Sequence, residues 1–124
     1  MLTDAPAFSG YSSNDIPAAR TFYGRTLGLA VTDENDMLTM RFPGGHTVII
    51  YPKPDHQPAT FTVLNFSVDD VGAAAARLAS AGVALERYEG FGQDDDGVMR
   101  GQGPDIAWFK DPAGNILSII GDRP

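Results

Sequence analysis

The chain of 124 residues has no cysteine. Disulfide bonds, thiol nucleophiles and thiolate metal sites are therefore excluded. Basic residues are also few, because 9 lysines and arginines stand against 16 acidic residues and give a formal net charge of −7. Nucleic acids and anionic membranes attract basic surfaces, so we expect neither as a partner.

Long hydrophobic runs are absent as well, since no apolar stretch approaches the roughly 18 residues of a membrane-spanning helix. No basic and apolar leader opens the sequence. We therefore expect a soluble protein of the cytoplasm. The hydrophobic content of 43% is ordinary for a globular chain, and the length predicts a single domain over residues 1–124.

The segment 106–120 predicts a β-hairpin. Apolar residues alternate on both sides of an Asp-Pro-Ala-Gly-Asn segment at 111–115, and proline followed by glycine favours chain reversal. One predicted face is uniformly apolar, whereas the other mixes Trp108, Lys110 and Ser118 with isoleucines. This second face is suited to the wall of a pocket, and a simple buried hairpin is the alternative.

The same order of elements occurs twice along the chain: a strand, a helix and three further strands. The first copy comprises predicted strands at 7–12, 29–32, 37–42 and 47–51 and a helix that Asn14-Asp15 begins and Gly28 ends. The second copy comprises strands at 60–67 and 83–89, an alanine-rich helix at 71–81 after Asp70, and the hairpin. A proline-rich linker, 52–58, separates module one, about 6–52, from module two, about 59–121. The fold class predicted is α+β.

Three stretches carry a resemblance to the vicinal-oxygen-chelate superfamily, which includes glyoxalase I, bleomycin-resistance proteins, fosfomycin-resistance transferases and extradiol dioxygenases. They are DIxxAxxFYxxxLGL at 15–29, FSVDDV with LAxxGV at 66–83, and WFKDPAGN at 108–115. The resemblance implies two βαβββ modules whose curled mixed sheets form a cleft, usually in a homodimer.

Most enzymes of that superfamily use a divalent metal, and the resemblance implies four ligand positions. These positions fall on Phe8, Ile50, Val63 and Ser118. None is a histidine or a carboxylate, which are the protein ligands that such metals require. We therefore predict no metal ion and no cofactor.

The histidines and the acidic run offer no replacement for those ligands. His46 falls in a predicted turn and His56 in the linker, so we expect both at the surface. The run Asp94-Asp95-Asp96 fails the spacing of an EF-hand loop, and we expect a solvated acidic loop there.

Alternate residues of a strand share a face, so the strands that carry the four positions predict a cleft lining. The candidate ligand-binding residues are Phe8, Ser12, Thr39, Arg41, Ile50, Phe61, Val63, Asn65, Trp108 and Ser118. The resemblance implies ligand contact for Trp108, because the fosfomycin-resistance branch has a ligand-contacting aromatic residue at that place. Two alternatives remain open: the apolar members fill a collapsed cleft, and Arg41 pairs with a surface carboxylate instead of anchoring an anion.

Glu86 and Tyr88 are the candidate acid–base residues, since one strand face could carry both. A carboxylate in an apolar site has a raised pKa and can act as a base. An exposed strand edge would explain the two residues as well. The glycine-rich loop 90–104 that follows could form a lid.

The first functional hypothesis is a metal-independent binding protein for a small, partly aromatic organic molecule. The alternative is a glyoxalase-like lyase or isomerase, or a ring-cleaving dioxygenase, with a non-standard or relocated site, for which superfamily resemblance is the only motive. A metal-free enzyme that uses Glu86 or Tyr88 is a third hypothesis.

Overall fold

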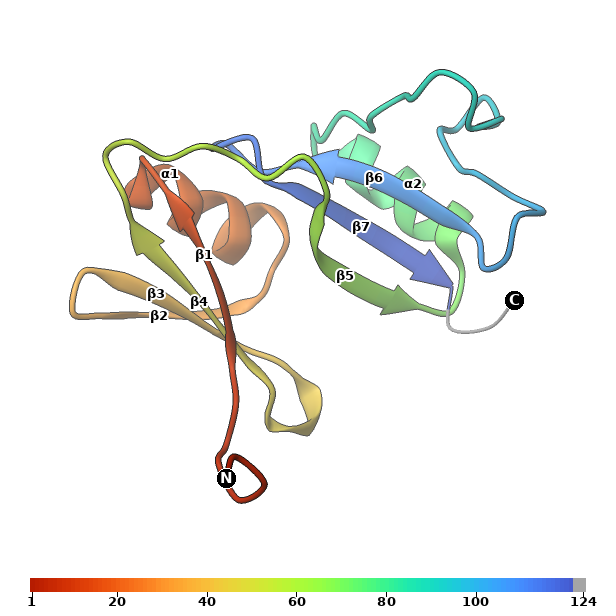
Figure 1. The fold of residues 1–124 in the computed structure, drawn as a ribbon. Coiled ribbons are helices and arrows are strands. Elements are labelled where there is room, and N and C mark those ends of the chain that lie inside the picture. The colour runs from red at the N-terminus through yellow and green to blue at the C-terminus, as the bar shows by residue number, and fades with distance from the viewer. Residues whose placement is uncertain (122–124) are drawn as a thin grey trace. The chain divides into compact units, whose positions relative to one another are not determined.

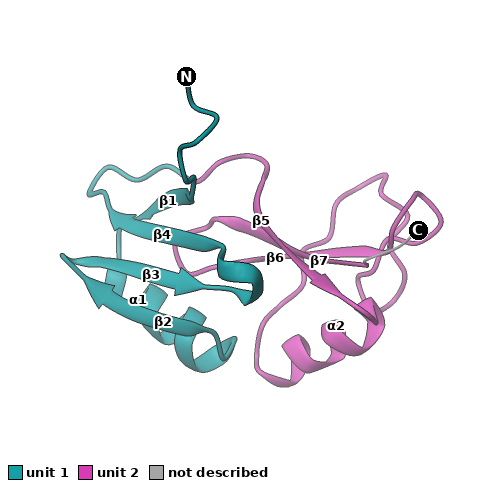
Figure 2. Cartoon of the chain, turned by 90° about the horizontal axis from the view of Figure 1, so that it is seen from below, with its two compact units in different colours: residues 1–57 teal, residues 58–124 magenta. Residues whose placement is uncertain are grey.

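The computed structural model describes residues 1–121, which fall into two compact units. Unit 1 spans residues 1–57 and unit 2 begins at residue 58 (Figure 2). Each unit contains one mixed β-sheet and a helix that packs on one of its faces. The predicted α+β fold class is therefore confirmed, and the boundary between the units falls within the predicted linker.

Unit 1 has the predicted order of a strand, a helix and three strands (Figure 1). Its elements are β1 (Ser9–Ser13), α1 (Ile16–Arg20), η1 (Thr21–Thr26), β2 (Ala30–Glu34), β3 (Met37–Arg41), η2 (Pro43–Gly45) and β4 (Thr47–Pro52). The strand order is β1-β4-β3-β2, with β1 parallel to β4 and the other pairs antiparallel.

The helix of unit 1 begins at the predicted cap. The Asp15 carboxylate accepts a hydrogen bond from the Ala18 amide at 3.0 Å, and a proline occupies the first turn, where no amide is needed. The predicted continuous helix is wrong in one respect, because it changes after Arg20 into the π-helical segment η1. The bond from the Leu27 amide to the Phe22 carbonyl, at 2.9 Å, spans five residues as a π-helix requires.

The core of unit 1 lies between its sheet and α1. Leu38, Met40, Val48 and Ile50 are fully buried or nearly so. Tyr11 reaches the same layer, where its hydroxyl donates to the Tyr23 hydroxyl at 2.8 Å. The face of the sheet that carries Tyr11 is therefore the helix-covered face.

Unit 2 contains β5 (Thr62–Val68), α2 (Val71–Ser80), β6 (Ile106–Lys110) and β7 (Ile116–Gly121). The strand order is β5-β7-β6, with β5 parallel and β6 antiparallel to β7. The Asp70 side chain accepts from the Ala73 amide at 3.0 Å and caps α2, as predicted. The face that α2 covers carries Leu117, Ile119 and Phe109.

The predicted strand 83–89 is wrong. The segment makes one β-bridge, between Leu85 and Phe109, and one backbone bond from the Glu86 amide to the Trp108 carbonyl at 2.7 Å. Beyond that point the Tyr88 amide donates to the Gln93 side chain at 2.7 Å. Because a side chain takes the amide that a strand would offer to β6, the sheet of unit 2 ends after three strands.

The turn between β6 and β7 is the predicted chain reversal. Asp111 Oδ1 accepts from the amides of Ala113 and Asn115, each at 2.9 Å. Asp111 Oδ2 accepts from Asn115 Nδ2, also at 2.9 Å. Gly114 has φ of 85°, a left-handed backbone that favours glycine, and a Cβ there would make a tight contact of 3.3 Å with the Pro58 ring. Within residues 1–121, no helix has the length and apolar character to cross a membrane.

Candidate functional site

One row of side chains crosses the face of the unit 2 sheet that α2 does not cover, which we call the helix-free face of unit 2. The strand register places Asn65 opposite Ser118 and Ser118 opposite Trp108. Ser118 Oγ donates to Asn65 Oδ1 at 2.5 Å. The sequence predicted all three as site residues, and the structure brings them together.

The members of this row differ in exposure. Ser118 is fully buried and Trp108 is 8% exposed, whereas Asn65 is exposed. The Asn65 amide nitrogen has no hydrogen-bond partner within residues 1–121. It is therefore a donor that a molecule lying on this face could use.

Three aromatic rings gather beside the row and form what we call the aromatic cluster: Tyr88, Phe91 and Trp108. The ring centres lie 5.4 Å apart for Tyr88 and Trp108, 5.2 Å for Phe91 and Trp108, and 5.4 Å for Tyr88 and Phe91. The ring planes are inclined by 75° for Tyr88 and Trp108, 70° for Phe91 and Trp108, and 52° for Tyr88 and Phe91. Such edge-to-face contacts are the favoured packing of aromatic rings.

The Tyr88 hydroxyl is buried and has no hydrogen-bond partner within the described part of the chain. Burial raises the pKa of this phenol, and the nearby Glu86 carboxylate raises it further. The hydroxyl therefore stays protonated at neutral pH and can donate a hydrogen bond. A Glu86 carboxylate oxygen lies 3.5 Å from Lys110 Nζ in an ion pair. The Glu86 amide donates to the Trp108 carbonyl and the Tyr88 ring packs on the Trp108 ring, so both predicted acid–base residues adjoin Trp108.

The loop after Tyr88 is tied down by side chains, unlike the predicted lid. Gln93 Nε2 donates to the carbonyls of Glu86 and Gly97 at 2.9 and 2.7 Å. Arg87 donates to the Asp94 and Asp95 carbonyls at 2.7 and 2.5 Å. Arg100 joins the carboxylates of Asp94 and Asp105 at 2.9 and 2.8 Å. Most of this acidic loop is therefore held in place by these bonds.

In unit 1, Ser12, Thr39 and Arg41 share the face opposite the helix. Ser12 Oγ and His56 Nδ1 share a hydrogen bond of 2.6 Å, so His56 is half-buried instead of lying at the surface as predicted. Arg41 forms an ion pair with Glu34 at 3.0 Å, and both side chains are about half exposed. The alternative reading of Arg41 as a partner of a surface carboxylate therefore describes this structure.

The structure corrects the predicted position of Ile50. The register pairs Ile50 with Tyr11, so its side chain lies in the core under α1 and does not share a face with Ser12, which pairs with Tyr51. A shift of one residue along a strand moves a side chain to the opposite face. Ile50 is a core residue, and Ile49 and Tyr51 take the face that was expected for it.

Three other candidates lie at the margins of their sheets. Phe8 precedes β1 and is 65% exposed, and Phe61 precedes β5 and is 68% exposed. Val63 lies at a β-bulge, where the register between β5 and β7 shifts.

Sequence reasoning missed Phe91. The residue lies in a polar loop, outside every predicted strand, and only its position between Gly90 and Gly92 marked it as unusual. Both glycines have a left-handed backbone, with φ of 85° and 65°.

The side chains at the implied metal positions do not fit a divalent cation. Ser118 and its neighbour Asn65 are neutral, and a hydrogen bond between Ser118 Oγ and Asn65 Oδ1 already engages both side-chain oxygens. Within residues 1–121, no three histidine, aspartate or glutamate side chains come together to hold an ion. Hard and borderline cations prefer carboxylate and imidazole ligands. The absence of a bound metal remains a prediction.

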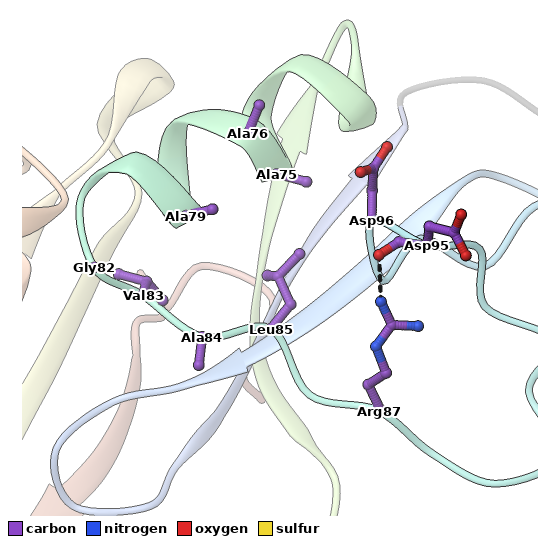
Figure 3. Close-up of a pocket in the computed structure, with 10 residues that line it drawn as sticks. All are labelled: Ala75, Ala76, Ala79, Gly82, Val83, Ala84, Leu85, Arg87, Asp95 and Asp96. Atoms are coloured by element: carbon purple, nitrogen blue, oxygen red, sulfur yellow. Dashed lines mark hydrogen bonds between the residues drawn. The ribbon is translucent and has the colours of Figure 1, made fainter.

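A separate groove of about 500 Å³ lies between α2 and the segment that follows it (Figure 3). Its lining residues are Ala75, Ala76, Ala79, Gly82, Val83, Ala84, Leu85, Arg87, Asp95 and Asp96. Six of these ten residues have small or aliphatic side chains, and the Arg87 guanidinium is already bonded to backbone carbonyls. The groove shares no residue with the aromatic cluster, and nothing in it selects a particular ligand.

A model of the Glyoxalase/Bleomycin resistance protein/Dioxygenase superfamily matches residues 9–119 of this sequence. Among solved structures, TnmS3, an antibiotic binding protein from Streptomyces sp. CB03234, is 23% identical, with 96% of this chain and 98% of that chain covered and a TM-score of 0.70. Lactoylglutathione lyase from Agrobacterium tumefaciens is 16% identical, with 97% and 96% covered and a TM-score of 0.70. A glyoxalase family protein from Enterococcus faecalis is 21% identical, with 97% and 99% covered and a TM-score of 0.66. No curated protein sequence matches this chain. At these identities the solved structures establish the fold alone.

Proposed function

Because the chain belongs to the glyoxalase/bleomycin resistance protein/dioxygenase superfamily, we propose that it binds a small, partly aromatic organic molecule without a metal ion. The observation that carries the proposal is the row of Asn65, Ser118 and Trp108 on the helix-free face of unit 2. Ser118 stands where the superfamily resemblance implies a metal ligand, and it is engaged by an amide instead.

The row and the aromatic cluster supply the two kinds of contact that small-molecule sites combine. Trp108, Tyr88 and Phe91 offer apolar ring surface, against which a planar ligand can pack. The Asn65 amide and the Tyr88 hydroxyl offer a few directed hydrogen bonds. Apolar walls with a few placed polar groups are typical of such sites.

The similarity to TnmS3 agrees with a binding role, because that protein is an antibiotic binding protein with the same fold. The lyase of Agrobacterium tumefaciens shares the fold equally. The side chains around Ser118 favour a binding role like that of TnmS3 over a lyase activity. A metal-dependent lyase would need metal ligands that this row does not offer.

A panel of aromatic compounds, drugs and metabolites included, would test the proposal on protein treated with a chelator. Trp108 is the only tryptophan, so tryptophan fluorescence reports this site alone. A binding compound should change that fluorescence and raise the melting temperature by mass action. Trp108→Leu is the matched variant, in which the compound should no longer raise the melting temperature. A panel that moves neither signal would overturn the proposal.

We also propose, from the superfamily resemblance, that the protein works as a homodimer in the cytoplasm. Light scattering on the purified protein would give twice the mass of the 13.2 kDa chain. The mass of a single chain at micromolar concentration would overturn the dimer.

A further inference from the structure

Phe91 sits at the tip of a short turn, between two glycines with positive φ. Left-handed backbone at two nearby positions is readily available only to glycine. The Gly-Phe-Gly sequence therefore places one large ring between two residues of left-handed backbone, and that ring packs on Trp108 and Tyr88.

The turn is closed at its base by Gln93. The Gln93 side chain accepts from the Tyr88 amide and donates to the Glu86 and Gly97 carbonyls. Inside the turn, the bond from the Phe91 amide to the Tyr88 carbonyl is long, at 3.2 Å. A displacement of Phe91 would therefore break this one bond inside the turn and leave the Gln93 bonds at its base and the sheet intact, which makes it a local opening.

Exposure separates Phe91 from the two rings that it contacts. Phe91 is 40% exposed, whereas Trp108 is 8% exposed and the Tyr88 hydroxyl is buried without a partner within the described residues. Leaving a buried hydroxyl unpaired is unfavourable. A hydrogen-bond acceptor that reached Tyr88 Oη would therefore be stabilised there.

We propose that the Phe91 ring occupies the place of the ligand's own aromatic ring, and that the ligand carries a neutral hydrogen-bond acceptor, a ketone or amide carbonyl, that pairs with Tyr88 Oη. This inference rests on the proposed function and names the ligand class of the same site. A ligand must displace Phe91 before its ring packs on Trp108, so Phe91 competes with every aromatic ligand.

The charges around the cluster favour a neutral acceptor over a carboxylate. The Glu86 carboxylate acts on the Tyr88 phenol closely enough to raise its pKa. Lys110 is already paired with Glu86, and the formal net charge of the chain is −7. An anion would meet repulsion at this place.

The test uses three small probes: acetophenone, ethylbenzene, which replaces the carbonyl by a methylene group, and benzoate. Binding to the full chain is followed by the chemical shift of the Trp108 indole N–H, a single resonance because the chain has one tryptophan. Acetophenone should bind about fivefold more tightly than ethylbenzene, as one added hydrogen bond allows, and benzoate should bind most weakly.

Two variants separate the contributions of the residues. Tyr88→Phe should remove the preference for acetophenone and leave ring binding, whereas Tyr51→Phe, which removes a phenol from unit 1, should not change it. Phe91→Ala should tighten both uncharged probes several-fold, because no internal ring has to be displaced. If Phe91 were an ordinary wall of the site, Phe91→Ala would weaken binding, and this inference would be overturned while the proposed function stood. An indole resonance that none of the probes moves, in wild type or Phe91→Ala, would overturn both.

Discussion

Ser118 Oγ donates a hydrogen bond of 2.5 Å to Asn65 Oδ1 across the parallel strands β7 and β5. The pair joins the last strand of the chain to the first strand of unit 2, on the face that α2 does not cover. Ser118 is fully buried, so its hydroxyl needs this partner. The same bond uses the Asn65 oxygen and leaves the amide nitrogen without a hydrogen-bond partner within residues 1–121, which links a stabilising contact to the proposed site.

Ser118→Ala should lower the free energy of unfolding by about 1 kcal/mol, because one hydrogen bond is lost while the exposed Asn65 can turn to water. Urea titration measures the change. Ser80→Ala at the exposed end of α2 is the control and should have a smaller effect. Equal effects for the two variants would show that the Ser118 bond contributes nothing.

Asp111→Ala should be more damaging, with a loss of about 3 kcal/mol, because the turn would leave several donors unpaired where Asp111 is 5% exposed and Asn115 is 2% exposed. Asp111→Asn keeps an acceptor for the two amides and should lose less. Chemical denaturation of both variants, with the exposed Asp4→Ala as control, measures the series. An Asp111→Ala protein as stable as Asp4→Ala would contradict this description of the turn.

Arg100→Gln should destabilise the protein at neutral pH and much less in acid. The hydrogen bond from Arg100 lowers the pKa of the Asp94 carboxyl below its ordinary 3.8. A lowered pKa contributes stability that is present above the ordinary value and is lost as the pH falls through the folded value. The difference in unfolding free energy between wild type and variant, measured by urea titration at about pH 7 and about pH 3, should therefore shrink in acid.

Arg77→Gln is the matched control for that experiment, because Arg77 is exposed and forms no ion pair within residues 1–121. The difference in unfolding free energy between Arg77→Gln and wild type should be the same at both pH values. A difference for Arg100→Gln that is equally large at both pH values would mean that Arg100 acts through packing and not through the Asp94 charge.

Alkaline pH should destabilise wild type more than Tyr88→Phe. Burial and Glu86 raise the pKa of Tyr88 above 10.0, so the folded protein holds this proton more tightly than the unfolded chain does. The resulting stability is complete below about pH 10 and is lost as the pH rises through the folded value. Melting temperatures of both proteins across that range check the prediction, and parallel curves would rule out a shifted Tyr88.

The parts of the fold that local chemistry decides could be predicted from the sequence. Asp15 and Asp70 cap the two helices because a short carboxylate side chain satisfies the first free amides. The Asp111 turn forms from residues that are adjacent in the chain. Asn65 and Ser118 were placed by the implied ligand positions together with alternation along their strands, Trp108 was placed by the family resemblance, and the register puts all three on one face.

The errors arose where the sequence held no such local signal. Val48, Ile49, Ile50 and Tyr51 are all apolar, so alternation could not show which of them faces α1. The strand expected at 83–89 fails because the Gln93 side chain captures the Tyr88 amide. The sequence pattern does not predict that role for a glutamine in a polar loop.

The most direct test of metal-independent binding is the affinity of the strongest compound from the panel, measured by titration calorimetry on the untagged protein before and after chelator treatment. The account predicts the same dissociation constant in both samples, with Trp108→Leu binding far more weakly. Binding that disappears on chelation and returns with added zinc, nickel, manganese or iron would contradict the account and favour a metal-dependent enzyme.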